Sequence, residues 1–465
     1  MSRAGPAPAR PGVTLRAPYS GYHATRIPPP DPDLTAIGPG TACGAYFRRF
    51  WHPVALSREL GGLPLALSIL GEDLVLYRDR RGRVGLLGRH CAHRGTSLEF
   101  AVVEERGLRC CYHGWLYGGD GTVLEAPGEP DDNRIAGRLR HAAYPTHEYR
   151  GLVFAYLGRP EERPRFPVFD TFELPGNRLV PYAIAQPCNW LQVQENAMDP
   201  IHAVYLHARV NRVQLSGPWA EIPTCEFFES GDSMYYVTGR RVGDMVWIRS
   251  GEIVLPNLVQ TGSLWEEARA ERLFSRVSLS RWDVPLDDTH TMAIGWRHFN
   301  RDVDPEGRGR EDLCGRGRVD FPGQTGDRAY HERQRDPGDW DAQVSQRPIA
   351  IHAMEHLGAS DRGVALHRRL VRKAIAGGIH PAGAAERVRN ADGLVSTHAH
   401  DTILHLPAGP EGDDRERLKR LGRGVLDAIL SGDALGEAER RAHIEGRLAA
   451  LCGRTRNPAP AGMDR

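Results

Sequence analysis

The spacing of apolar and polar residues predicts a β-rich region near the start of the chain. Between about residues 45 and 160, short apolar runs are separated by turn residues. Residues 67–88 are typical of paired strands around a glycine-containing turn at 80–83, and residues 151–158 form a further buried strand. These patterns predict a small β domain.

A proline-rich passage at 158–170 predicts a linker to a second, larger domain. The later pattern predicts a helix over 189–210, strands over 233–257 and 290–300, and helices within 361–377 and 413–450. The expected fold class is therefore α+β, with a larger antiparallel sheet flanked by helices beside the β-rich domain.

The same patterns divide the chain into four parts. They are a Pro/Arg-rich N-terminal arm (1–40), a small domain (41–160), a larger domain (161–453) and a disordered C-terminal tail (454–465). Within the arm, the first 34 residues are expected to be disordered or laid on the surface. Residues 301–318 are rich in Arg and Gly without periodicity, which predicts a mobile loop.

The composition of the chain argues against several classes of function. The chain has 60 basic and 59 acidic residues, so no strong field favours nucleic acid or an acidic membrane as a partner. No apolar run reaches the roughly 18 residues of a membrane span, and no signal-peptide pattern opens the chain, so we expect a cytoplasmic protein. Eight cysteines are too few at this length for a disulfide framework.

Two short segments combine cysteine and histidine. Cys91 and His93 lie in RHCAHRG, and Cys110 and His113 lie in CCYHGW, which gives the spacing C-x-H-x16-C-x-x-H. Two thiolates and two imidazoles could hold a tetrahedral zinc ion or a Rieske [2Fe–2S] cluster. The tight C-x-H spacing is uncommon for zinc and favours the cluster. Cys111 does not fit the spacing and is interpreted as a packed neighbour.

A second candidate site lies in QENAMDPIHAVYLH. His202 and His207 are five residues apart, which is about 140° around an ideal helix, so they converge on one ion only if the helix bulges or breaks. A carboxylate from elsewhere would complete a 2-His-1-carboxylate triad, which lets Fe(II) bind O₂. Alone, this histidine pair is a weak signal. An electron-delivering cluster in the same chain makes the iron site the better interpretation.

The motifs CAHRG, CYHGW and ENAMDPIHAVYLH together resemble the oxygenase component of Rieske non-haem iron oxygenases. The resemblance is to the type built from α-subunits only, as in phthalate dioxygenase and the aromatic O-demethylases, and it extends from about residue 38 to 414. It implies a Rieske domain at 41–160 and an iron-binding catalytic domain at 161–453. It also implies a third iron ligand downstream, which the family's spacing places at Asp339, with Asp341 as the nearby rival.

The resemblance further implies a head-to-tail homotrimer, in which the cluster of one chain faces the iron of the next. Asp199 matches the acid that would connect His113 of one subunit to His202 of its neighbour and so form a hydrogen-bonded electron path. Asn196 would lie beside the iron.

The activity implied is O₂-dependent hydroxylation, or O- or N-demethylation, of an aromatic or heterocyclic small molecule. Electrons would come from a separate NAD(P)H-dependent reductase or ferredoxin, because the chain has neither a dinucleotide-binding glycine motif nor a plant-type ferredoxin motif. One alternative is cis-dihydroxylation of an aromatic acid. Alternatives of other classes are a non-enzymatic zinc-stapled binding protein and an electron carrier that uses only the cluster.

Two positions depart from the family pattern, since Ala92 stands where proline is usual and Cys111 where proline or a similar residue is usual. Neither is a ligand position, so cluster assembly is not affected. The substrate pocket is expected between about 205 and 340. That region holds Trp219, Trp247, Trp265, Trp282 and Trp296, each expected in the core rather than in the pocket. Arginine and histidine groups that could hold a substrate carboxylate are too numerous to choose among.

Overall fold

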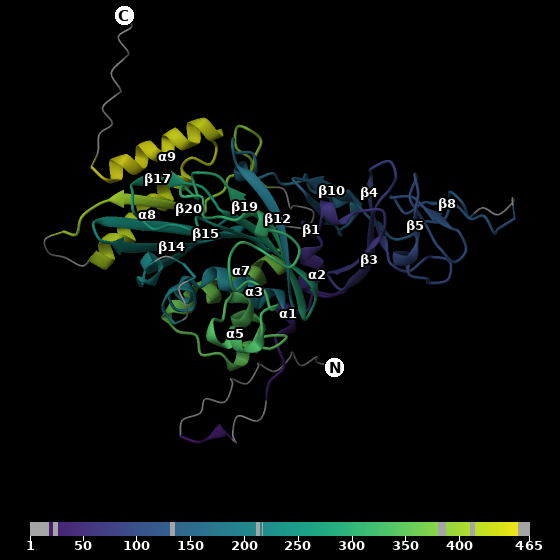
Figure 1. The fold of residues 1–465 in the computed structure, drawn as a ribbon, viewed down its shortest axis with the longest axis horizontal. Coiled ribbons are helices and arrows are strands. Elements are labelled where there is room, and N and C mark those ends of the chain that lie inside the picture. The colour runs from purple at the N-terminus through teal and green to yellow at the C-terminus, as the bar shows by residue number, and fades with distance from the viewer. Residues whose placement is uncertain are drawn as a thin grey trace, which may run out of the picture.

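The computed structural model describes residues 18–21, 27–130, 135–210, 214–215, 217–379, 387–409 and 414–453. A small β-rich part lies at one end of the molecule, and a large sheet with its helices forms the other (Figure 1). The predicted tail at 454–465 and most of the predicted arm lie outside the described residues. No helix in the described ranges is both long and apolar enough to span a membrane.

The small part contains three antiparallel sheets with the orders β1-β11-β10, β2-β3-β4-β9 and β5-β6-β7-β8. Its strands are β1 (Trp51–Leu56), β2 (Leu65–Ile69), β3 (Glu72–Arg78), β4 (Val84–Gly88), β5 (Val102–Val103), β6 (Leu108–Arg109), β7 (Leu116–Tyr117), β8 (Val123–Glu125), β9 (Ala143–Tyr144), β10 (Thr146–Tyr149) and β11 (Leu152–Tyr156). The predicted turn at 80–83 is confirmed, because β3 pairs with β4 and places Arg78 opposite Val84.

The large antiparallel sheet has the order β12-β19-β18-β16-β15-β14-β13, and β20 pairs with both β15 and β17. Its strands are β12 (Arg178–Gln186), β13 (Thr224–Ser230), β14 (Ser233–Val242), β15 (Met245–Val254), β16 (Leu258–Thr261), β17 (Arg272–Ser275), β18 (Leu279–Asp287), β19 (His290–Phe299) and β20 (His400–His405). The strands predicted over 233–257 and 290–300 are confirmed.

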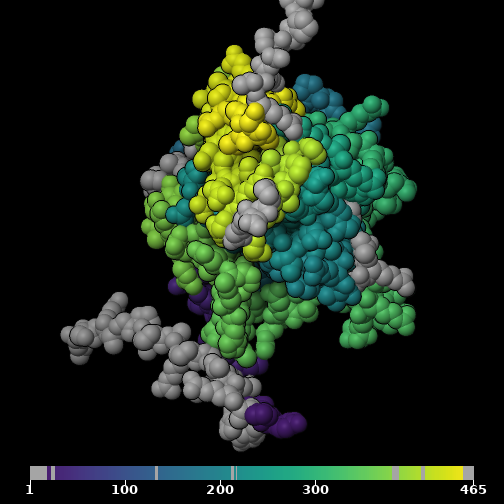
Figure 2. All heavy atoms as spheres, turned by 90° about the vertical axis from the view of Figure 1, so that its left-hand side faces the viewer, coloured from purple at the N-terminus to yellow at the C-terminus, as the bar shows by residue number. Residues whose placement is uncertain are grey.

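Helices cover both faces of this sheet. The α-helices are α1 (Pro32–Thr35), α2 (Ala42–Phe47), α3 (Trp190–Glu195), α4 (Pro200–Val204), α5 (Tyr330–Arg335), α6 (Asp339–Val344), α7 (Arg362–Ile375), α8 (Asp414–Leu430) and α9 (Glu437–Leu451). The apolar side of α8 packs on β14 and β15, α9 packs on α8 and β17, and the two helices form the yellow surface of Figure 2. On the opposite face, α3 and α7 share a core with β15, β16 and β18 (Figure 1).

Two segments differ from the sequence-based expectation. Leu34 in α1 is fully buried, and its carbonyl accepts a hydrogen bond from the indole of Trp190 at 3.1 Å, so this part of the predicted arm belongs to the core. In the predicted mobile loop at 301–318, Val303 and Cys314 are buried. Both segments contain isolated apolar residues that pack against distant parts of the chain. Such residues leave no hydrophobic periodicity in the sequence.

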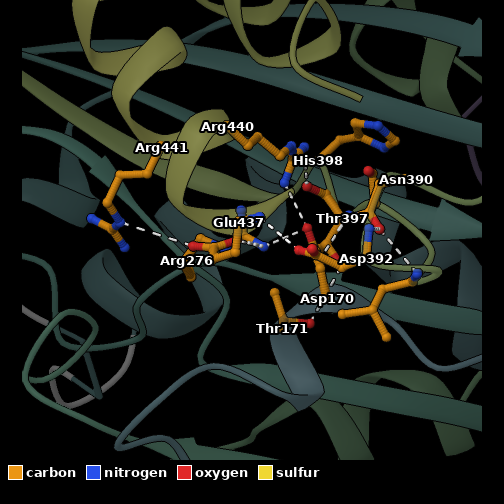
Figure 3. Close-up of polar contacts among 12 residues, drawn as sticks. Asp170, Thr171, Arg276, Asn390, Asp392, Thr397, His398, Glu437, Arg440 and Arg441 are labelled. Atoms are coloured by element: carbon orange, nitrogen blue, oxygen red, sulfur yellow. Dashed lines mark hydrogen bonds and ion pairs between the residues drawn. The ribbon is translucent and has the colours of Figure 1, made fainter. Parts of the chain in front are cut away.

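A buried ionic cluster fastens α9 to the rest of the domain (Figure 3). Asp170 pairs with Arg276 at 2.6 Å and with Arg440 of α9 at 2.7 Å, and all three side chains are almost inaccessible to solvent. Arg440 also donates to the carbonyl of Thr397 at 2.9 Å. Because a buried charge is stable only when it is paired, one carboxylate holds together three segments that are far apart in the sequence.

Candidate metal centres

The two Cys/His segments fold into loops with the same backbone turn. The carbonyl of Cys91 accepts a hydrogen bond from the amide of Gly95 at 2.8 Å, and the carbonyl of Cys110 accepts one from the amide of Gly114 at 3.1 Å. Both glycines are in the left-handed region, with φ of 76° and 74°. Only glycine adopts this conformation readily, which explains the glycine that follows each histidine.

These loops bring two thiols and two imidazoles together. Cys91 and Cys110 are buried, and burial together with contact to the Cys91 thiol raises the pKa of Cys110. The rings of His93 and His113 lie 4.5 Å apart at 74°. Nδ1 of His93 is buried and has no hydrogen-bond partner in the described part of the chain. An orphaned imidazole nitrogen beside two thiols fits the donor set of a Rieske cluster.

Cys111 is exposed, although the sequence suggested a packed neighbour. The turn that buries Cys110 directs the next side chain outward.

The second site is built on a broken helix. The segment predicted as one helix over 189–210 is divided into α3, a 3₁₀ turn (Asn196–Met198), α4 and a π-helical turn (Tyr205–Arg209). The carboxylate of Asp199 caps α4 by accepting from the amides of Ile201 and His202 at 3.0 and 3.3 Å. The predicted irregularity between His202 and His207 is thus confirmed, and the π turn rotates His207 toward His202.

His202, His207 and Asp339 converge. The Nε2 atoms of the two histidines lie 3.5 and 3.2 Å from Oδ1 of Asp339, and one ligand atom from each residue falls within 4.8 Å of the others. Asp341 instead pairs with Arg328 and Arg333 at 2.9 and 2.7 Å. The structure therefore brings Asp339, and not Asp341, to the histidines, in a donor set suited to Fe(II).

Amide side chains orient these donors. Asn196 donates to Oδ1 of Asp339 at 3.2 Å, and Gln324 donates to Oδ2 at 2.6 Å. Oε1 of Gln214 accepts from Nδ1–H of His207 at 2.7 Å, which leaves Nε2 of that ring available to a metal. Sequence reasoning named Asn196 but missed Gln214 and Gln324, which lie in no recognisable motif.

Asp339 and His207 are electrostatically coupled. Burial favours neutral Asp339, but His207 and the surrounding donors outweigh it and hold the pKa of this carboxyl well below its usual range. Burial likewise disfavours charged His207, yet Asp339 raises the pKa of this imidazole. The carboxylate is therefore ionised and ready to bind a cation.

Of the two histidines in the expected electron path, Asp199 lies near His202, on the iron side. Its Oδ2 lies 3.9 Å from Nδ1 of His202, and the side chain is 31 % exposed. The loop of Cys91 and His93 lies between β4 and β5, and the loop of Cys110 and His113 lies between β6 and β7. Both belong to the small β-rich part, at the far end of the molecule from α3 (Figure 1). Within one chain, Asp199 therefore does not connect to His113, and its bridging role remains a prediction about an assembly.

A cavity opens at His202, His207 and Asp339. Trp219, expected in the core, lines this cavity, whereas Trp282 and Trp296 belong to the main hydrophobic core as expected. Its apolar wall includes Ile184, Leu215, Val259, Leu264, Leu279 and Phe321. The residues extend from 182 to 339, so the cavity begins earlier in the chain than the predicted 205–340.

Comparison with known proteins agrees with both centres. Residues 50–145 match the family model of the Rieske [2Fe-2S] domain. The chain is 44 % identical to the tert-butanol monooxygenase / tert-amyl alcohol desaturase oxygenase subunit of Aquincola tertiaricarbonis, over 92 % of this chain and 95 % of that protein. It is 36 % identical to the phenoxybenzoate dioxygenase subunit alpha of Ectopseudomonas oleovorans, over 79 % of this chain and 90 % of that one.

The fold has a solved counterpart in dicamba monooxygenase bound to dicamba, with a TM-score of 0.54 and 19 % identity over 71 % of this chain and 97 % of that one. The relatives are oxygenases, which favours this class over the zinc-stapled and electron-carrier alternatives. The chain therefore belongs to the oxygenase (α) subunits of the Rieske non-haem iron oxygenases, oxidoreductases that use a [2Fe–2S] cluster, a mononuclear iron and O₂.

Proposed function

We propose that this subunit hydroxylates, or O- or N-demethylates, an aromatic or heterocyclic compound bound in the cavity beside His202, His207 and Asp339. The observation that carries the proposal is that these donors open directly into a single cavity with a largely apolar wall. Such a wall holds a planar ring against the reacting centre and excludes water.

In this proposal His202, His207 and Asp339 hold Fe(II), and Cys91, His93, Cys110 and His113 hold the [2Fe–2S] cluster. When bound, the iron would activate O₂ and the cluster would supply electrons. The protein's own contribution is positional. Asn196 and Gln324 fix both oxygens of Asp339, and Gln214 fixes the tautomer of His207.

The electron donor is proposed to be a separate NAD(P)H-dependent reductase or ferredoxin, and the assembly a homotrimer in the cytoplasm. The trimer is supported by the separation of the two centres within one chain (Figure 1). The partly exposed Asp199 would then face His113 of a neighbouring subunit. A carboxylate accepting from both imidazoles would connect the two centres.

Turnover with a surrogate reductase tests the activity. The substrate panel contains methoxyarenes, N-methyl heterocycles, aromatic acids and tert-butanol, the last because a relative is a tert-butanol monooxygenase. Formaldehyde would indicate demethylation, and a cis-diol product would indicate dioxygenation. A hydroxylated alcohol would indicate oxidation of an aliphatic substrate. The proposal predicts formaldehyde or a ring- or side-chain-hydroxylated product, and conversion of tert-butanol alone would overturn the proposed substrate class.

A further inference from the structure

One wall of the cavity carries a buried cation without an acidic partner. Arg240 of β14 is 2 % exposed, and its guanidinium lies 5.3 Å from the ring centroid of Trp219 and 5.0 Å from that of Trp247. Its Nε donates to the carbonyl of Glu221 and its Nη1 to the hydroxyl of Thr238, both at 3.2 Å. Among the residues that the structure describes, no carboxylate lies within 4 Å of this guanidinium.

The other cavity arginines are each neutralised by an acid. The pairs are Arg249 with Asp401 at 3.1 Å, Arg281 with Asp283 at 2.9 Å and Arg297 with Asp320 at 2.6 Å. Arg240 is therefore exceptional among the arginines that line the cavity.

The nearby Asp401 cannot serve Arg240 as well. Its two oxygens accept hydrogen bonds from Arg249, from the indole of Trp247 at 2.7 Å and from the amide of Ser263 at 2.6 Å. Both oxygens of the carboxylate are thus already occupied by other donors. The two indole faces compensate part of the desolvation of Arg240, but they add no negative charge.

A second group in the same wall is also unsatisfied. The indole Nε1 of Trp219 is buried and has no hydrogen-bond partner within the described ranges. Burial and the neighbouring charge of Arg249 lower the pKa of Arg240 to about 10, so the guanidinium is still charged at neutral pH. An uncompensated cation beside an unused N–H donor is what an oxyanion ligand requires.

We propose that Arg240, with the Trp219 indole beside it, binds a carboxylate on the substrate, and that the enzyme therefore acts on aromatic carboxylic acids. This inference rests on the proposed function, which places the reaction in this cavity. One cavity is lined by Arg240 and Trp219 and by His202, His207 and Asp339, so an acid anchored at Arg240 stays in the compartment where oxidation would occur.

The test compares acids with neutral amides of nearly the same shape. Benzoate and benzamide, and 4-methoxybenzoate and 4-methoxybenzamide, are titrated calorimetrically into the anaerobic holoenzyme. We expect each acid to bind at least about tenfold more tightly than its amide, because a charge-assisted pair with a desolvated arginine forms only with the acid. Equal binding, or tighter binding of the amides, would overturn the proposal.

Variants then assign the preference to the residue. Arg240→Gln should weaken binding of the acids by about tenfold or more and leave the amides nearly unchanged. Trp219→Phe keeps the ring, removes the N–H donor and should give a smaller loss. The matched control is Arg241→Gln, because Arg241 is the next residue on β14 but pairs with Asp414 at 2.6 Å. The acid preference must survive in this control.

The visible absorption of the cluster reports whether each variant is folded. If Arg240→Gln does not fold, Arg240→Lys and the acid–amide comparison on the unaltered enzyme decide the question. The two proposals fail separately. Acid binding at Arg240 without any turnover would refute the proposed aromatic oxidation alone, whereas turnover of neutral methoxyarenes without an acid preference would refute the carboxylate site alone.

Discussion

Replacing Gln324 with leucine should weaken iron binding while leaving the cluster intact. The amide of Gln324 donates to Oδ2 of Asp339 at 2.6 Å, and leucine keeps the approximate volume but removes the donor. A hydrogen bond to a charged group contributes about 1.5–3 kcal/mol, which corresponds to about a 10- to 150-fold weaker iron affinity. Asn196 still holds Oδ1 at 3.2 Å, so we expect the lower part of that range.

The assay is anaerobic competition for Fe(II) between the protein and a chelator, with cluster absorbance recorded in the same samples. Gln346→Leu is the control, because Gln346 is exposed just beyond α6 and close to Asp339 in sequence. The double variant Gln324→Leu/Asn196→Leu should lose more than the sum of the single changes, because the carboxylate then has neither donor to fix it. An unchanged iron affinity in Gln324→Leu would refute the reasoning that this amide holds Asp339 in a ligating position.

Three further predictions follow from other contacts. His207→Ala should remove the mononuclear iron, measured by metal analysis, and abolish turnover while the cluster absorption remains; retained turnover would show that His207 is not a ligand. Asp170→Asn should lower the free energy of unfolding by about 3–5 kcal/mol, seen as a lower calorimetric melting temperature, because two buried arginines lose their shared carboxylate; an unchanged melting temperature would contradict this. Burial disfavours charged His398, but Glu252 and Asp433 raise its pKa from 6.5 to about 9. The group therefore contributes about 3 kcal/mol that is fully present below pH 6.5 and lost as the pH rises through 9. The melting-temperature difference between the unaltered protein and His398→Gln should be largest at pH 6 and vanish near pH 10, and a pH-independent difference would count against the assignment.

The parts of the fold that could be predicted are those that the local sequence determines. Each Cys/His loop contains its ligands and its left-handed glycine within five residues, so the local spacing favoured the cluster. The five-residue separation of His202 and His207 likewise required a helical irregularity, and the structure has a π turn at 205–209. Local constraints of this kind do not depend on the rest of the fold.

What could not be predicted depends on contacts between distant segments. Gln324 and Gln214 act on the iron-binding side chains from loops that resemble any other polar loop. Leu34 was assigned to an arm because its neighbours are proline and aspartate, yet it packs beside Trp190, 156 residues away in sequence. Periodicity does not detect a single apolar residue that is buried by a remote partner.

Charge pairing is likewise not predictable from the sequence alone, as Arg240 and Arg241 show. Alternation along a strand predicts only that the two side chains leave β14 on opposite faces. Arg241 pairs with Asp414, whereas Asp401, whose charge acts on Arg240, is already paired with Arg249. With 60 basic and 59 acidic residues, the overall charge gives no sign that one buried cation lacks a carboxylate partner among the described residues. The missing acid is a property of the assembled cavity, and in the proposed site the carboxylate of a bound substrate would supply it.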